Sequence, residues 1–247
     1  MHAPSPTEPI LKASARDFAC DLDLSHEETS YLLELAGHLK ASPDRYASAL
    51  AGRSLSLMFE KPSLRTRLTF ELAIKQLGGD SIFSVGMIGE REPIKDVARN
   101  LDRWTKAIVA RVFSQTTIEE LARWANVPVI NALSDLYHPC QVLADLQTLR
   151  ERCGALRGIN LTFVGDGNNV AHSLMLSAVR LGKEGEAYVR LTYADALAAS
   201  GDHGRASEVA RVARDRLLAH AAKISDPRWR TSFLELIPEN ARTLRLG

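Results

Sequence analysis

The sequence predicts an α/β protein in which helices flank a parallel β-sheet, and three observations lead to this prediction. Short apolar runs bounded by turn-forming residues recur along the chain as far as Leu181, as buried strands do. Amphipathic stretches separate these runs. Strand and helix alternate throughout, which favours parallel strands joined by crossover helices.

Each expected element has its own local signal. Ser25 followed by Glu28 forms a capping box and predicts a helix over 26–40, which Pro43 follows. Apolar runs predict strands at 54–59, 81–85, 107–113, 127–133 and 159–165. Amphipathic periodicity predicts helices at 65–79, 95–106, 118–126 and 139–154. Gly78-Gly79 marks the end of the helix over 65–79.

The character of the sequence changes after Leu181. Residues 183–247 are rich in Ala, Arg and Leu and contain no convincing strand. Two helices are expected there, over 186–202 and 205–225, joined at 201–204. We therefore expect a helical tail behind the α/β part.

Composition excludes several classes of protein. The 31 Lys and Arg against 30 Asp and Glu leave a net charge of +1, which argues against a nucleic-acid partner. No apolar run is long enough to cross a membrane, and no secretory signal is visible. Three cysteines at unrelated spacings favour reduced thiols. A soluble, cytoplasmic protein is expected.

The stretch from Phe59 to Arg67, FEKPSLRTR, lies where a strand ends and a helix begins. Free amides at a helix start attract anions. Ser63 and Thr66 add hydroxyls, and the Arg65 guanidinium suits phosphate. The alternative is a capped helix with two solvated arginines.

Two further strand ends carry polar groups. Arg111 ends the strand over 107–113, and His138 and Gln141 follow the strand over 127–133. Ligands of parallel sheets bind outside the carboxyl ends of strands, so His138 is placed to polarise a carbonyl and Gln141 to donate or accept a hydrogen bond. The alternative is that His138 caps a helix and that Gln141 is incidental.

A glycine-rich turn follows the strand over 159–165. The GxGxxG spacing of a dinucleotide site is absent, so the amides of Asn168 and Asn169 suit a small polar ligand instead. The His and Cys residues show no metal-binding spacing, and no metal is expected.

FEKPSLRTRLTFE resembles the carbamoyl-phosphate signature of the aspartate/ornithine carbamoyltransferase family, and PVINALSDLYHPCQVLADLQTL and FVGDGNNVAHSLM resemble its ornithine branch. The resemblance covers roughly residues 20–182. It implies a carbamoyl-phosphate-binding domain over 1–150, the first βα unit of a truncated ornithine-binding domain over 151–182, and a tail over 183–247. It also implies arginine biosynthesis as the pathway.

The resemblance implies a role for each candidate residue, with no metal or organic cofactor. Ser63, Leu64, Arg65 and Thr66 would hold the phosphate of carbamoyl phosphate. Arg111 and His138, with Thr66, would hold the carbamoyl oxygen, and Gln141 would accept from the carbamoyl NH₂. Asn169 and Asn168 would meet ornithine. The family also implies a homotrimer.

The sequence departs from the family in three places. Leu64 replaces the commoner Thr, and Met87 replaces a Gln or His in the loop that reaches a neighbouring subunit. The Ser-Met-Gly and His-Cys-Leu-Pro segments have no counterpart after Leu181. In their place the tail loosely resembles the end of a tetratricopeptide-like region, through Gly201, Asp202 and Ala206, or is simply a helical cap.

Three hypotheses follow. The chain is an ornithine carbamoyltransferase homologue that makes citrulline and phosphate with weak or lost activity, a non-catalytic carbamoyl-phosphate-binding remnant, or an interaction module that works through its helical tail. If the sheet of the second domain is cut short, the tail is expected to pack against the strand over 159–165 and its helix.

Overall fold

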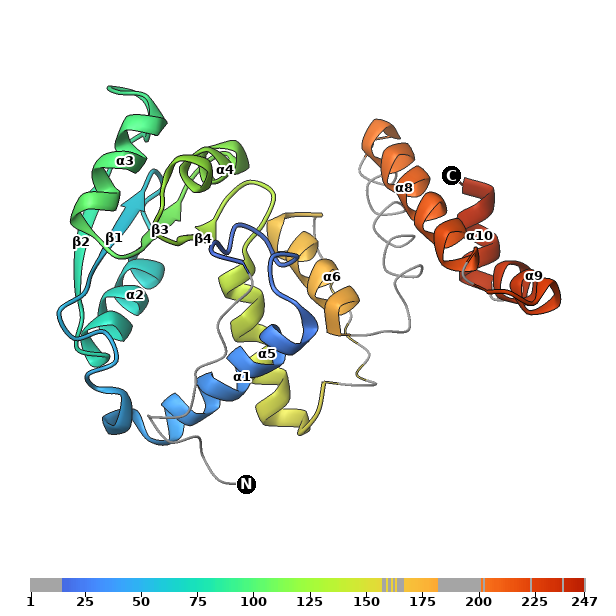
Figure 1. Ribbon diagram of the computed structural model, residues 1–247, viewed down its shortest axis with the longest axis horizontal. Coiled ribbons are helices and arrows are strands. Elements are labelled where there is room, and N and C mark those ends of the chain that lie inside the picture. Colours follow the sequence, from blue (N-terminus) through green and yellow to red (C-terminus); the bar gives the residue numbers. More distant parts are fainter. Residues whose placement is uncertain are drawn as a thin grey trace. The chain divides into compact units, whose positions relative to one another are not determined.

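The computed structural model describes residues 15–156, 167–181, 203–222, 224–236 and 238–246, together with residues 159, 161, 163 and 201 (Figure 1). The chain divides into two compact units, Met1–Ile159 and Asn160–Gly247, and each is described by itself below. No helix of the described part is long and apolar enough to cross a membrane.

The first unit is built on a four-stranded parallel sheet, which confirms the predicted fold class. The strands lie in the order β2-β1-β3-β4. Their bounds are Ser54–Phe59 for β1, Asp80–Val85 for β2, Ile108–Arg111 for β3 and Val129–Leu133 for β4. Phe59 pairs with both Val85 and Arg111, so the carboxyl ends of the three neighbouring strands lie at one edge of the sheet.

Helices cover both faces of this sheet (Figure 1). The helices are α1 (His26–Ala41), α2 (Leu64–Gln76), α3 (Ile94–Trp104), α4 (Gln115–Trp124) and α5 (Pro139–Cys153). One apolar cluster joins β3 to α3 and α4 through side chains such as Ile108, Leu101 and Ile118. A second cluster joins β1 to α2 through Leu57, Phe59 and Ile74. The sheet is therefore the middle layer of three.

The local signals act as predicted at two helix ends. The Ser25 side chain accepts from the Glu28 amide while the Glu28 side chain accepts from the Ser25 amide, which completes the capping box of α1. Gly78 takes a φ of 80° just beyond α2, as a residue after a helix commonly does. The largest shift of a helix start in this unit is at α4, which begins at Gln115 and not at 118, because the Ser114 side chain caps it.

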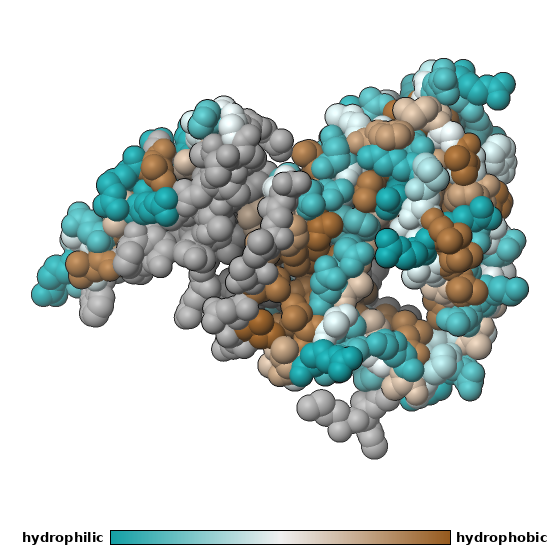
Figure 2. Space-filling view, turned by 180° about the vertical axis from the view of Figure 1, so that it is seen from behind, coloured by the Kyte–Doolittle hydropathy of each residue, from teal (hydrophilic) through white to brown (hydrophobic). Residues whose placement is uncertain are grey.

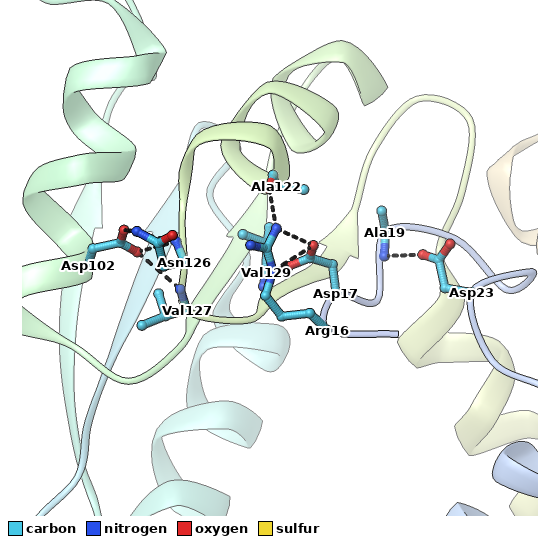
Figure 3. A network of polar contacts seen from close by, with 9 residues as sticks. All are labelled: Arg16, Asp17, Ala19, Asp23, Asp102, Ala122, Asn126, Val127 and Val129. Carbon is cyan, nitrogen blue, oxygen red and sulfur yellow. Dashed lines mark hydrogen bonds and ion pairs between the residues drawn. The ribbon is translucent and has the colours of Figure 1, made fainter. Parts of the chain in front are cut away.

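The segment before α1 pairs with the free edge of β4, which the sequence did not predict. Phe18 donates to Val129 O at 2.8 Å and accepts from Asn131 N at 2.9 Å. The Asp17 carboxylate accepts from Val129 N at 2.9 Å (Figure 3). The segment thereby satisfies backbone groups that would otherwise lie unpaired along an edge strand.

The regular elements described in the second unit are all helices. It contains α6 (Asn169–Leu181), α8 (His203–Ala221), α9 (Pro227–Glu235) and α10 (Pro238–Leu246). α8 buries a stripe of small residues and one leucine, namely Ala206, Ala210, Ala213, Leu217 and Ala221, and α10 packs against α8 and α9. The sequence predicted only two tail helices and missed α9 and α10, although each begins with a proline, a common first helical residue.

Several predicted elements lie outside the described residues. They are most of the strand over 159–165 and the helix over 186–202. The predicted boundary near residue 182 also lies outside the described residues. The packing of the tail against that strand stays a prediction for the same reason.

Candidate functional site

The start of α2 is not capped by its own N-cap residue. Ser63 has the extended backbone of an N-cap, with φ −157° and ψ 104°, but its side chain makes no capping bond. Its hydroxyl donates instead to Thr66 Oγ1 at 2.9 Å. The first amides of a helix have no intrahelical acceptor, and the first turn of α2 holds no acidic residue. The first turn of α2 therefore supplies no counter-charge of its own to the positive end of the helix.

The two arginines of this turn have different surroundings. Arg67 Nε donates to Glu71 Oε1 at 2.9 Å, and its guanidinium lies 3.9 Å from the centre of the Phe83 ring. Arg65 is exposed and pairs with no carboxylate among the residues that the structure describes. Arg67 is thus a structural residue of α2, whereas Arg65 keeps its charge available for an anion.

Thr66, Arg111 and His138 come from three strand ends and meet in the first unit. Arg111 Nη1 donates to Thr66 Oγ1 at 3.5 Å, a long contact. The charge of Arg111 acts on His138. Leu64, by contrast, is 73% exposed and joins the group only through its backbone. The structure therefore brings together the three residues expected at the carbamoyl oxygen.

The electrostatics of this group favour an anionic or strongly polar ligand. Burial lowers the pKa of Arg111, and its Nε is buried without a hydrogen-bond partner. Burial and then the Arg111 charge lower the pKa of His138 to about 4. Its imidazole is neutral at pH 7, so that it can donate a hydrogen bond without carrying a charge. Within the described part of the chain, no carboxylate forms an ion pair with Arg111.

A buried polar network holds the turn that carries His138. Asn131 Nδ2 donates to Ala19 O at 2.8 Å and to Gln115 Oε1 at 3.2 Å. Ser134 Oγ donates to Gln115 Oε1 at 2.7 Å and accepts from Tyr137 N at 3.0 Å. Since Tyr137 precedes His138, these bonds fix the start of α5 against β4. No local sequence pattern predicts this network, because Ala19 and Gln115 lie far along the chain from the turn that they hold.

Gln141 lies on the first turn of α5 and is exposed. Its Nε2 donates to Asp145 Oδ1 at 3.0 Å, which leaves its Oε1 as the acceptor. This orientation of the Gln141 amide is the one needed to accept a hydrogen bond from an NH₂ group.

Asn168 and Asn169 belong to the second unit. The side-chain oxygen of Asn168 accepts from the amides of Val170 and Ala171, at 3.0 and 3.1 Å, so Asn168 caps α6. Asn169 is the first residue of that helix. Among the described residues of both units, no cluster of His, Cys, Asp and Glu could hold a metal ion.

Comparisons with known proteins match the first unit closely. Residues 16–151 match the family model "Aspartate/ornithine carbamoyltransferase, carbamoyl-P binding domain". The ornithine carbamoyltransferase of Vibrio sp. (strain 2693) is 51% identical over 165 residues, which are 66% of this chain and 55% of that protein. The corresponding protein of Acidothermus cellulolyticus is 52% identical over 172 residues, 68% of this chain and 54% of that protein.

Solved structures give the same result. Ornithine carbamoyltransferase from Pyrococcus furiosus matches with a TM-score of 0.67 and 43% identity, over 70% of this chain and 57% of that one. The enzyme from Thermus thermophilus matches with a TM-score of 0.64 and 49% identity, over 68% of this chain and 59% of that one. The chain spans little more than half the length of the relatives that it matches.

Proposed function

The chain belongs to the aspartate/ornithine carbamoyltransferase family, and on that premise we propose that its first unit binds carbamoyl phosphate at the carboxyl edge of the sheet. One observation carries the proposal. Thr66, Arg111 and His138 converge from three strand ends, beside an uncapped helix start, with no carboxylate among the described residues paired to Arg111. Such a site attracts a small, doubly charged anion.

The phosphate group lies at the start of α2 in this proposal. The amides of Leu64, Arg65 and Thr66 donate to phosphate oxygens, together with the hydroxyls of Ser63 and Thr66. The exposed guanidinium of Arg65 folds over the anion and supplies a two-pronged contact. Leu64 takes part through its amide alone, so its apolar side chain does not weaken this contact.

The carbamoyl group lies toward Arg111 and His138. Both donate to the carbamoyl oxygen, with Thr66, and Gln141 Oε1 accepts from the NH₂ group. When an amine attacks the carbonyl carbon, a C–N bond forms and the oxygen gains negative charge, which the fixed donors stabilise. The bond between the carbonyl carbon and the oxygen that bridges it to phosphorus then breaks. Phosphate leaves with the electron pair of that bond, and the attacking amine loses a proton.

The amine acceptor in the proposal is the side-chain nitrogen of ornithine, which would give citrulline and phosphate, a step of arginine biosynthesis in the cytoplasm. Asn169 and Asn168 are the proposed ornithine ligands. Residues 183–247 contain neither a Ser-Met-Gly nor a His-Cys-Leu-Pro segment, so these residues do not offer the family's usual ornithine contacts. We therefore propose that turnover is weak or lost, since a misplacement of about 1 Å can cost about 100-fold in rate.

The absence of those two segments from residues 183–247 also favours a second candidate function, which is a non-catalytic carbamoyl-phosphate-binding remnant or an interaction module with a helical-repeat tail.

Self-association belongs to the proposal as well. α2 exposes Leu64, Leu68 and Leu72 at intervals of four residues, which is one face of a helix. The edge strand β2 exposes Ile82 and Val85. Apolar residues also lie among polar ones on the face of the molecule seen in Figure 2. An apolar face of this kind favours burial against another copy of the chain, and a homotrimer is the proposed assembly.

Calorimetric titration with carbamoyl phosphate and an assay of citrulline formation test the proposal together. Arg65→Ala should weaken binding by about 10-fold or more, because it removes a charged phosphate contact. Arg53→Ala is the matched control, since Arg53 is also exposed but precedes β1, at the other end of the strand. Binding without citrulline favours the remnant, and no binding by the folded wild-type chain refutes the proposal.

A further inference from the structure

Glu60, the residue that follows β1, contacts the turns after two neighbouring strands. Its Oε1 accepts from Ile88 N at 3.0 Å, in the turn after β2. Its Oε2 accepts from Phe113 N at 2.7 Å, in the turn after β3. Its own amide donates to Arg111 O at 2.9 Å. One residue thereby joins the end of β1 to the last residue of β3 and to the turns after β2 and β3.

Two of these bonds hold the backbone that directly follows the Cα of Arg111. The Glu60 amide holds the carbonyl of Arg111, and the Glu60 carboxylate holds the amide of Phe113, two positions later. The neighbouring Lys61 places its Nζ 4.4 Å from the centre of the Phe113 ring. Two bonds therefore attach the backbone directly after the Arg111 Cα to the segment that leads into α2.

Placing the Glu60 carboxylate in the interior of the unit costs free energy of folding. Glu60 is only 8% exposed, and in the described part of the first unit it forms no ion pair with a lysine or arginine. Burying a charge is unfavourable unless hydrogen bonds compensate, and here two backbone amides do so. The regular strand pairs already end at Phe59, so the sheet itself does not need these bonds.

We infer that Glu60 is a positioning residue, which holds the start of α2 and the end of β3 at the spacing that one carbamoyl phosphate requires. This inference rests on the proposed function. Glu60 does not touch the ligand; it acts through Arg111 and through the amides of the α2 start. It also attaches the turn that exposes Met87, which is 50% exposed beside the buried Ile88.

Glu60→Gln tests the inference because it keeps the shape of the side chain. A glutamine amide has one oxygen, so one of the two turns meets an NH₂ group in place of an acceptor. The matched control is Asp102→Asn. The Asp102 carboxylate accepts from the amides of Asn126 and Val127, at 2.8 and 3.1 Å, just before β4 begins and thus at the amino edge of the same sheet (Figure 3).

Two measurements are made on each full-length variant. Calorimetry gives the dissociation constants of carbamoyl phosphate and of inorganic phosphate, and urea unfolding gives stability. We expect Glu60→Gln to weaken carbamoyl phosphate binding about 10-fold or more, and Asp102→Asn to leave it within about twofold at a comparable loss of stability. Wild-type affinity in Glu60→Gln would show that the residue supports the fold only, and would overturn the inference.

Amide hydrogen exchange without ligand separates this result from a failure of the proposed function. In Glu60→Gln, the amide that faces the new NH₂ group, that of Ile88 or that of Phe113, should exchange faster than in the wild type, while that of Val127 should not. If the wild-type chain binds no carbamoyl phosphate, the proposed function fails, and exchange alone then decides whether Glu60 holds the two turns. Unchanged protection of both amides refutes the inference whatever the ligand does.

Discussion

Protonation of His138 is the perturbation that tests the charge balance of the site most directly. Burial and the Arg111 charge lower the pKa of His138 from 6.5 to about 4, while the unfolded chain keeps the ordinary value near 6.5. Between these two values the unfolded state binds more protons than the folded state. The free energy of unfolding contributed by His138 is therefore fully present above about pH 6.5 and falls as the pH is lowered toward about 4.

The size of the effect follows from the same two values. They differ by about 2.5, and each pKa unit corresponds to about 1.4 kcal/mol, so the upper limit is about 3.4 kcal/mol. His138 is only partly buried, so solvent screening reduces the expected loss to about 1–2 kcal/mol.

Urea unfolding of the wild type and of His138→Asn, at about pH 7.5 and about pH 4.5, measures this loss. Asparagine does not titrate in this range, so the wild type should lose about 1–2 kcal/mol more than the variant as the pH falls. An equal loss in both proteins would refute the reasoning. So would an imidazole proton resonance of His138 that titrates near its ordinary pKa, because the site would then not hold the ring neutral.

Three further predictions concern the scaffold. Gly78→Ala should cost about 2 kcal/mol or more in urea unfolding, because a Cβ there would clash with the backbone oxygen of Ala47. Gly154→Ala, at the same φ of 80° but in open space, should cost only about 1 kcal/mol. Ser25→Ala should cost about 1 kcal/mol in the same assay through loss of the α1 cap; an unchanged midpoint would contradict this. Leu68→Asp should leave the free energy of unfolding nearly unchanged, because Leu68 is exposed. If α2 forms the subunit contact, the same variant should have a lower mass in analytical ultracentrifugation. An unchanged mass would exclude this face as the contact.

Much of the first unit was predictable because its signals are local. The capping box of α1, the glycines after α2 and the apolar runs of β1 to β4 each depend on a few consecutive residues. The α4 cap at Ser114 was missed, since a single serine before two threonines gives a weak pattern. The pairing of Phe18 with β4 was missed for a different reason: it depends on an edge that exists only once the sheet has formed.

The candidate site, too, was predictable where its residues are close in the sequence and not where they are far apart. The sequence identified Ser63, Arg65 and Thr66 from one stretch, and the structure adds that Arg67 beside them is occupied by Glu71 and Phe83. Glu60 stood in that stretch without a role. The two carboxylate oxygens of Glu60 accept from amides that lie 28 and 53 residues away in the chain. No local sequence pattern predicts such a contact.

The sequence by itself determined the kinds of elements, their order and the chemical groups at each strand end. Backbone propensity, capping and apolar periodicity act over a few residues, so they can be recognised one segment at a time. Only the tertiary structure decided that β1 lies between β2 and β3, and with it that Thr66, Arg111 and His138 meet. The order of the strands depends on how helices bury both faces of the sheet. That burial involves residues from the whole unit, so no single segment determines it.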